Sequence, residues 1–361
     1  MKKSLIALAV LGLSGAAMAQ SSVTLYGVAD AGVGKIAAGA SDANTKYGRA
    51  SVLGGMNDNN NKTQFMSQSL MNNGTSRLGV RGVEDLGAGN QVGFNFETGL
   101  DLDNGGSGSN FWARQANMWV GGQWGTVKLG RQFTASYLAI GTYELTGQAN
   151  YSVVGNTYKY AGLTQRADSA FAYITPTFSG LTAAVAYVSK NDYVGLNAWD
   201  AALLYSNGPI AAGLSVNKVK TSKTNYQLGG KYTFGNFAVA ASYTQASNVG
   251  AAVTGTSENA LQTAYAVNSN ALKANRRGFG LGGSANFGAF TATVDLTRDI
   301  KNQWVSGSYL NPDGVTYTNN KKYTNGVVEL KYALSKRTFL YGAYLRLDGT
   351  NNYGLGMRHN F

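Results

Sequence analysis

The sequence of 361 residues lacks cysteine and contains only three prolines and one histidine. Without cysteine, an exported chain of this size must hold together without disulfide bonds. The single histidine, His359, excludes a histidine-based triad or dyad, and with no cysteine it cannot build a zinc site. Of the carboxylate pairs, Glu84 and Asp85 fall in an expected turn, and no other pair is placed at a shared site. We therefore expect no enzyme, no metal and no cofactor.

Long apolar runs are also missing, because no stretch beyond the N-terminus is long enough for a membrane-spanning helix. The N-terminus itself has two lysines, a short apolar run over 5–13 and small residues ending in Ala17-Met18-Ala19. This pattern predicts a signal peptide over 1–19 that is cleaved on export. The mature chain would then cover 20–361.

The charge is basic, with a formal net charge of +12 at pH 7. A basic excess often indicates binding to nucleic acid or an anionic surface. Here the charges are scattered at strand spacing rather than gathered in runs, and the chain is predicted to be exported. We therefore expect no nucleic-acid partner.

Glycine and tyrosine are abundant, at 48 and 22 residues, in segments that alternate between apolar and polar positions. In one such segment Arg77, Gly79 and Arg81 share a face, while Leu78 and Val80 lie on the other. This period of two predicts antiparallel strands with one apolar and one polar face. Composition alone also fits a soluble β-sandwich.

The connections between these segments alternate regularly between short turns and longer polar stretches. That order is typical of a transmembrane barrel with tight periplasmic turns and longer outer loops. The sequence predicts an all-β fold, a 16-stranded antiparallel transmembrane β-barrel, with an even strand number in the size range that leaves an aqueous channel. The expected strands are 23–35, 68–83, 91–103, 111–122, 126–133, 166–178, 180–190, 200–206, 209–219, 226–235, 236–246, 276–287, 289–300, 323–334, 336–347 and 352–361.

Phenylalanines lie beside the short turns, on the apolar face of their strands where the alternation can be followed. They predict an aromatic girdle at the membrane interface. Aromatic packing in a sandwich core is the alternative, since aromatic residues favour strands in general. The girdle would comprise Phe178, Phe234, Phe237, Phe287, Phe290, Phe339 and Phe361.

The segment 134–165 breaks the pattern, since it has neither strand alternation nor a sustained helical stripe. A structureless segment of this length inside a compact domain is suspect unless it is functional. We expect it to fold inward as the third outer loop and to narrow a pore. Glu144 and the arginines facing it would then form the functional centre.

Several motifs resemble the trimeric general porins of Gram-negative outer membranes, in their beta-proteobacterial branch. They are the signal ending AMAQ, the start SSVTLYGVADAG, the strand SRLGVRG, the run RQANMWVGGQWGTVKLGRQF before the long loop, and the ending GLGMRHNF. The resemblance covers essentially the whole mature chain. It implies a sixteen-stranded barrel, three copies per assembly, and a third outer loop folded into each lumen.

The resemblance also implies a constriction in which a basic cluster on the wall opposes acidic groups. The basic wall would be Arg77, Arg114 and Arg166. Arg81 shares the face of Arg77 but lies nearer the short turn. Glu144 would be the loop acid, and Glu97 a lumen-facing acid on the third strand.

The alternation of side chains along the expected strands places two further polar residues on the outside of the barrel. Arg131 shares a face with Val127 and Leu129, and Asn117 falls on the outward face of the expected fourth strand. A lipid-facing arginine is costly, so we expect Arg131 and Asn117 at a subunit interface or at the rim. The terminal Phe361 resembles the signal that outer-membrane barrels present for insertion.

The predicted function is an outer-membrane channel for passive diffusion of small hydrophilic solutes and ions, with a preference for anions. Expected partners are two further copies of the chain, outer-membrane lipids and lipopolysaccharide, and the barrel assembly machinery. Two alternatives remain open: an adhesin or binding barrel that works through its long outer loops, and a substrate-specific channel. Tyr143, Tyr151, Tyr158 and Tyr160 of the inward loop would favour the substrate-specific channel.

Overall fold

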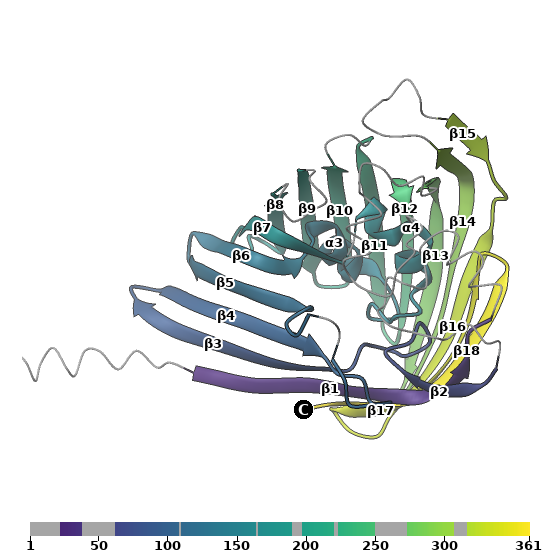
Figure 1. Cartoon of the computed structure of the whole chain (residues 1–361), viewed down its shortest axis with the longest axis horizontal. Coiled ribbons are helices and arrows are strands. Elements are labelled where there is room, and N and C mark those ends of the chain that lie inside the picture. The colour runs from purple at the N-terminus through teal and green to yellow at the C-terminus, as the bar shows by residue number, and fades with distance from the viewer. Residues whose placement is uncertain are drawn as a thin grey trace, which may run out of the picture.

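The computed structural model describes residues 22–37, 62–107, 110–163, 165–189, 197–219, 223–249, 273–306 and 316–361. These residues form a closed, antiparallel β-barrel whose wall has sixteen main strands, which confirms the predicted fold (Figure 1). The wall consists of β1 (Ser22–Lys35), β3 (Arg77–Gly87), β4 (Asn90–Gly99), β5 (Gln115–Gly122), β6 (Gly125–Phe133), β7 (Arg166–Ile174), β8 (Leu181–Val188), β9 (Ala198–Asn207), β10 (Ile210–Val219), β11 (Asn225–Phe234), β12 (Phe237–Val249), β13 (Lys273–Phe287), β14 (Phe290–Ser306), β16 (Thr324–Ala333), β17 (Thr338–Leu347) and β18 (Thr350–Asn360). The predicted signal peptide lies outside the described residues.

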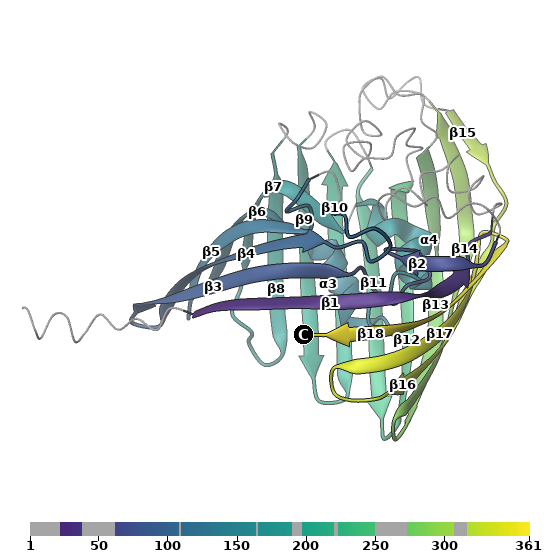
Figure 2. The ribbon, with the colours of Figure 1, turned by 60° about the horizontal axis from the view of Figure 1, so that its bottom comes forward.

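The barrel closes where its first strand meets its last. On one edge β1 pairs with β3, from Ser22 to Val28, and on the other it pairs with β18, from Val28 to Lys35. Figure 2 shows β1 and β18 side by side. Because both edges of β1 are paired, neither end of the sheet offers free backbone groups to another chain.

Alternation along the strands sets an outer apolar face and an inner polar face. On β18 Leu355 and Met357 are exposed, while Asn352 is fully buried on the inner side. On β9 Leu203 is exposed and Asp200 is buried. A barrel that turns apolar side chains outward requires an apolar surround, and its polar interior suits water.

The short turns have the chemistry that two-residue hairpins require. Gly208, Gly235 and Gly288 have φ of 56°, 56° and 60°, a left-handed conformation that glycine adopts without strain. The register fixes the same lengths, since Asn207 pairs with Ile210 and Phe287 with Phe290. The predicted turns at these positions are confirmed.

Two short strands extend the wall and were not predicted. β2 (Gln64–Ser67) pairs with the outer end of β1, and β15 (Thr316–Asn319) pairs with the outer end of β14. The second expected strand was placed at 68–83, but β3 begins at Arg77. Residues 68–76 leave the wall instead and form an inner segment whose residues from Ser69 to Asn73 are buried. We call residues 68–76 the inner segment.

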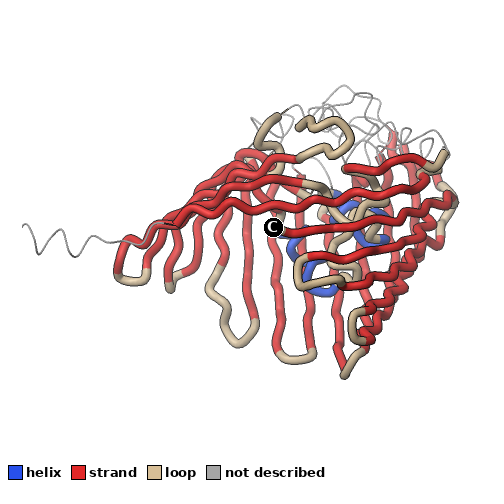
Figure 3. Tube along the Cα trace, turned by 90° about the horizontal axis from the view of Figure 1, so that it is seen from below, coloured by secondary structure: helices blue, strands red, loops and turns tan. Residues whose placement is uncertain are grey.

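The segment 134–165 folds into the barrel, as predicted. It was expected without regular structure, but it contains two short helices, α3 (Ala135–Tyr143) and α4 (Val153–Gly162). Seen from below in Figure 3, both helices lie within the ring of strands. We call residues 134–165 the inward loop.

Phenylalanines surround the end of the barrel that carries the short turns. Phe178 is 80% exposed, and Phe234, Phe287 and Phe290 are about half exposed. Phe339 was assigned to the same girdle, but that assignment is wrong, because Phe339 pairs with inward-facing Arg358 and packs against the inner apolar cluster. No helix in the described part of the chain is long and apolar enough to cross a bilayer.

Candidate pore constriction

The inward loop is anchored by a polar contact between the start of α3 and the wall. Asp200 of β9 accepts hydrogen bonds from the Ser136 backbone N at 2.9 Å and from Ser136 Oγ at 2.6 Å. Gln227 of β11 donates to the Ser136 carbonyl at 2.6 Å, and Thr134 caps the helix by accepting from Tyr137 N. A carboxylate at a helix N-terminus is favoured by the free amide groups and the helix dipole.

Glycines on the facing strands leave the room that the inward loop needs to pack against the wall. A Cβ at Gly213 would lie 2.2 Å from the Ala139 carbonyl oxygen, one at Gly229 2.4 Å from the Tyr143 ring, and one at Gly278 2.1 Å from Tyr158 Oη. Those distances are far shorter than any ordinary contact. The loop therefore lies close to the wall of β10 to β13 only because these positions lack side chains.

The inner segment fastens the tip of the inward loop from the opposite side. The Asn73 carbonyl accepts from Asn150 N at 3.2 Å, and Asn73 Nδ2 donates to Tyr151 Oη at 2.8 Å. Tyr151 Oη in turn donates to Glu329 of β16 at 2.5 Å. The loop is thus held on both flanks, and its two helices pack against the wall formed by β8 to β14, β16 and β17.

Two of the predicted wall arginines meet one predicted acid on that wall. Arg114 Nε lies 2.7 Å from Glu97 Oε1, and Arg77 Nε lies 3.6 Å from Glu97 Oε2. Tyr26 Oη also donates to Glu97, at 3.1 Å. Glu97 is only 4% exposed. It therefore fixes two guanidinium groups side by side and neutralises part of their charge.

Arg166 stands at the junction of β7 with the inward loop. Its guanidinium carbon lies 4.6 Å from the centre of the Phe133 ring, which stacks on Tyr137 of α3 at 4.7 Å. Arg166 and Arg114 are close enough to interact electrostatically. Burial raises the pKa of the Tyr137 phenol, and the positive charges of Arg166 and Arg114 act in the opposite sense. The geometry thus brings together Arg77, Arg114 and Arg166.

Arg81 lies one step further toward the short turns. It is on the inner face of β3 opposite Thr24 and Asn95, and its guanidinium carbon lies 5.3 Å from the centre of the Tyr26 ring. It therefore lines the same wall below the cluster of Arg77 and Arg114.

Glu144 has a different position from the one expected for the loop acid. Its carboxylate accepts from Thr146 Oγ1 at 2.5 Å and from Gln148 N at 2.6 Å, so it braces the turn after α3. Glu144 is 4% exposed, and among the described residues it forms no ion pair with Arg77, Arg114 or Arg166. The acid in direct contact with Arg77 and Arg114 is Glu97.

Asn117 faces the lumen, so its assignment to the outside of the barrel is wrong. It pairs with Asn95, donates to the Arg131 carbonyl at 2.7 Å and is 4% exposed, whereas its neighbour Met118 is 55% exposed. The expected strand began at 111, but β5 begins at Gln115. The chain bends at Arg114, so the inward and outward positions do not alternate regularly through this residue. Alternation counted from Arg114 therefore assigns each residue of β5 to the wrong face of the barrel.

Arg131 forms an ion pair within the chain. Its guanidinium pairs with Asp168 of β7 and donates to the Ala113 carbonyl. A bulge between Gly130 and Gln132 accompanies this contact. The expected cost of a lipid-facing arginine is therefore lowered by Asp168, and its place at a subunit interface stays a prediction.

Two basic residues of the interior were not assigned to the constriction from the sequence. Arg358 of β18 lies opposite Asp30 on the inner face, and Lys331 of β16 donates to the Thr146 carbonyl at 2.8 Å. Lys331 also pairs with Glu329 at 3.1 Å. Alternation in GLGMRHNF already turned Arg358 inward, but nothing in the sequence showed its height in the barrel.

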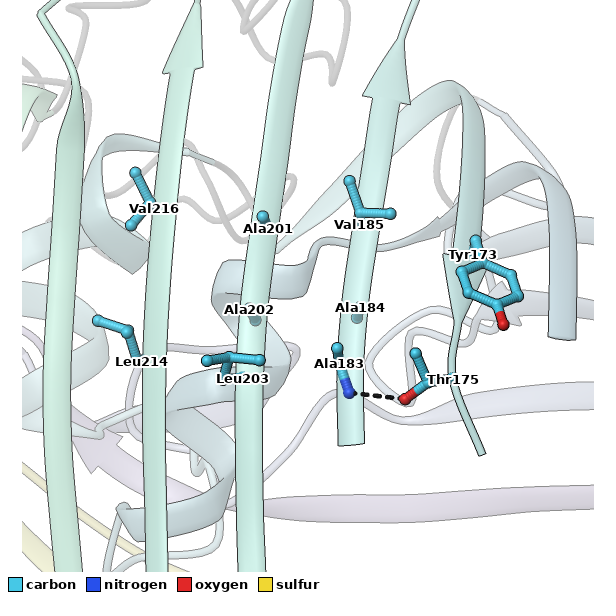
Figure 4. Close-up of a pocket in the computed structure, with 10 residues that line it drawn as sticks. All are labelled: Tyr173, Thr175, Ala183, Ala184, Val185, Ala201, Ala202, Leu203, Leu214 and Val216. Atoms are coloured by element: carbon cyan, nitrogen blue, oxygen red, sulfur yellow. Dashed lines mark hydrogen bonds between the residues drawn. The ribbon is translucent and has the colours of Figure 1, made fainter. Parts of the chain in front are cut away.

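The outer surface carries an apolar groove rather than a second polar site. It has a volume of about 310 Å³ and lies over β7 to β10, where small Ala183 and Ala201 are flanked by Tyr173, Val185 and Leu203 (Figure 4). Its position on the outward face separates it from the arginine cluster.

The family model for Gram-negative porins matches residues 4–352. The chain belongs to the Gram-negative porin family. It is 30% identical to an outer membrane porin protein of Bordetella pertussis, over the full length of both chains. It is 36% identical to outer membrane porin protein 32 of Delftia acidovorans, over 65% of this chain and 67% of the relative.

Two solved structures establish the same fold for this porin. An anion-selective porin from Comamonas acidovorans superposes with a TM-score of 0.65 and 22% identity, covering 95% of this chain and all of the other. OmpT of Vibrio cholerae gives a TM-score of 0.62 and 13% identity, covering 94% and 98%. Its membership of the Gram-negative porin family makes this barrel an outer-membrane protein that forms a water-filled channel for passive diffusion.

Proposed function

We propose that this channel prefers anions, because its narrowed region holds more positive than negative charge. Glu97 contacts Arg77 and Arg114, and Arg166 is near enough to interact electrostatically with Glu97 and Arg114. The porin from Comamonas acidovorans, which has the same fold, is described as anion-selective. The cluster of arginines around a single carboxylate is the observation that carries the proposal.

The magnitude follows from Coulomb's law. An anion about 7 Å from one arginine gains roughly 0.6 kcal/mol at the dielectric constant of water, and about four times that beside a protein wall. A net of about two positive charges then favours anions by roughly 1 to 5 kcal/mol at low salt. The Debye length falls from about 10 Å at 0.1 M to about 3 Å at 1 M, so the preference should fade as salt rises.

Reversal potentials in a KCl gradient across planar bilayers test the proposal. The wild-type channel should pass chloride over potassium, and replacing Arg77, Arg114 and Arg166 together by serine should abolish or invert that ratio. Replacing Arg131 alone should leave the ratio nearly unchanged, since Arg131 lies on the outward face of β6 together with Leu129 and not on the lumen side. A cation-selective wild type would overturn the proposed preference.

The alternative of a substrate-specific channel loses its main support. Tyr143, Tyr151 and Tyr158 are each at most 1% exposed, because they pack between the inward loop and the wall. They cannot line a track for a passing ligand. Linear growth of single-channel conductance with salt supports a general channel, whereas block by one solute class would favour the specific one.

We further propose that the chain loses residues 1–19 on export and works as a homotrimer. The family supports the trimer, and the basic and apolar N-terminus supports the cleavage. Outer-membrane lipids, lipopolysaccharide and the barrel assembly machinery are the proposed partners of its outer face and its terminus. Because its relatives are porins, we infer that it is not an enzyme.

A further inference from the structure

A fourth arginine, Arg358, lies near the arginine cluster although it comes from the far end of the chain. Asn360 of β18 pairs with Val28 of β1, and Val28 pairs with Arg77 of β3. These three residues therefore form one row across the barrel seam. Arg358 is the next inward-facing position above Asn360, two strands from Arg77, or about 10 Å across the sheet. Arg358 also interacts electrostatically with both Arg77 and Arg114.

The nearest wall acid does not form an ion pair with Arg358. Asp30 lies directly opposite it in the register, but the Asp30 carboxylate accepts from Tyr341 Oη at 2.6 Å, from Asn72 Nδ2 at 3.1 Å and from Gly74 N at 2.8 Å. Within the described ranges no carboxylate approaches Arg358 to 4 Å, whereas Glu97 approaches both Arg77 and Arg114. Asp30 still attracts Arg358 electrostatically, but the Asp30 carboxylate is shared with three other donors and does not contact the guanidinium directly, unlike Glu97 with Arg77 and Arg114.

A side chain of the inner segment holds Arg358 in place. Asn73 Oδ1 accepts from Arg358 Nη1 at 2.9 Å. A Cβ at Gly74 would lie 2.5 Å from the same nitrogen, so the glycine leaves room for the guanidinium. Asn73 is 5% exposed and is itself fixed by Tyr151 and Asn150 of the inward loop. One amide therefore ties the arginine to the tip of the loop that narrows the pore.

We propose that Arg358 is a selectivity-determining residue of the constriction and that Asn73 is its positioning residue. The inference rests on the proposed anion preference and adds a residue and a mechanism to it. A passing anion would meet Arg358 from the seam side and Arg77 with Arg114 from the neighbouring wall. Because Asn73 binds both Arg358 and the inward loop, the position of the loop would determine where the Arg358 guanidinium lies in the pore.

The absence of cysteine from the chain allows the charge to be changed after folding. The channel is reconstituted as R358C and its reversal potential is measured in a gradient around 0.1 M KCl. A cationic and an anionic methanethiosulfonate reagent are then added to the open channel in separate experiments. The matched control is R337C, which removes the same charge on an exposed short turn.

R358C should lower the chloride-to-potassium permeability ratio about threefold, the effect of one unit charge at about 7 Å in water. The cationic reagent should restore the ratio, and the anionic reagent should lower it further. R337C should match the wild type before and after each reagent. N73A retains the arginine but should lower the ratio in the same direction, with no added effect in the N73A/R358C double variant.

The outcomes separate this inference from the proposed function. A wild-type channel without anion preference overturns the proposed function. A wild-type channel that prefers chloride, with R358C and both its modified forms indistinguishable from R337C, overturns the role of Arg358. If R358C does not insert, N73A decides, because an unchanged ratio in N73A overturns the positioning.

Discussion

Replacing Gly229 by alanine should push the inward loop off the wall and narrow the pore. The added Cβ would lie 2.4 to 2.5 Å from three atoms of the Tyr143 ring. Carbon atoms in contact stay about 3.5 to 4.0 Å apart, so the ring must retreat by about 1 Å. Tyr143, the last residue of α3, is 1% exposed and packs against β11, whereas Arg77 and Arg114 belong to β3 and the start of β5, on the opposite part of the ring of strands. The helix end therefore moves toward the arginines.

The barrel itself should survive this change. Overpacking of a well-filled core costs about 1 to 3 kcal/mol, which the closed hydrogen-bonded wall should tolerate. Single-channel conductance in 1 M KCl should fall, because the cross-section shrinks. The chloride preference at 0.1 M KCl should hold or rise, because anions pass closer to Arg77 and Arg114. A general loss of structure would instead reduce the number of channels without changing the conductance of each.

The adjacent Gly230 provides a matched control on the same strand. A Cβ there would find its nearest neighbour, the Ala211 carbonyl, at 3.8 Å, which is an ordinary contact. Gly230→Ala should therefore conduct like the wild type. Equal conductance in the Gly229→Ala and Gly230→Ala channels would refute the idea that the glycines facing the inward loop determine the width of the pore.

Three further predictions concern the ion pairs and the closing strand. Glu97→Gln should raise the chloride-to-potassium ratio about threefold at 0.1 M KCl, and an equal rise in exposed Glu84→Gln would contradict this. Deleting Phe361, whose backbone exchanges two 3.1 Å hydrogen bonds with β1, should reduce the heat-modifiable trimer on unboiled gels of outer membranes; undiminished trimer would refute it. Arg276→Met leaves buried Asp299 and partly buried Asp348 without their guanidinium partner and should lower the free energy of unfolding by about 3 to 5 kcal/mol, so an unchanged midpoint of unfolding in guanidinium chloride would count against it.

The barrel could be predicted from sequence because its signal is repeated in every strand. Apolar outward residues alternate with inward residues along the strands of the wall. Glycine turns such as those at Gly208 and Gly235 fix the hairpin lengths. Each hairpin is thus specified locally. An error at one strand end does not propagate past the next turn.

The helices of the inward loop gave no such signal, and the structure shows why. The buried face of α3 comprises Ala135, Ser136, Ala139, Ile140 and Tyr143, and the opposite face, with Tyr137, Leu138 and Gly141, is no more polar, so the sequence shows no contrast between two faces. The buried face contacts a polar barrel wall, where Ser136 needs Asp200 as a partner. An apolar stripe marks a helix that packs on an apolar core. A helix seated against a water-facing wall has no need of one.

Side-chain faces were predicted correctly only where the strand had no irregularity. The bend at Arg114 inverted the face assigned to Asn117, and the chain left the wall over the inner segment where a strand was expected. Both changes serve the constriction, since Arg114 reaches Glu97 and the inner segment carries Asn73. Departures from regular pairing are frequent near functional sites, so alternation fails where it matters most for function.

The height of each residue in the barrel is the quantity that one strand cannot reveal. Arg358 is three residues from the C-terminus, whereas Arg77 stands at the outer end of β3, so their sequence positions suggest opposite ends of the wall. The strands are staggered, and the pairs Asn360 with Val28 and Val28 with Arg77 bring Asn360 level with Arg77, so that Arg358 lies one inward position above it. Stagger accumulates around a closed barrel as its shear. The arginine cluster is therefore a property of the registers of many strands, which no single motif contains.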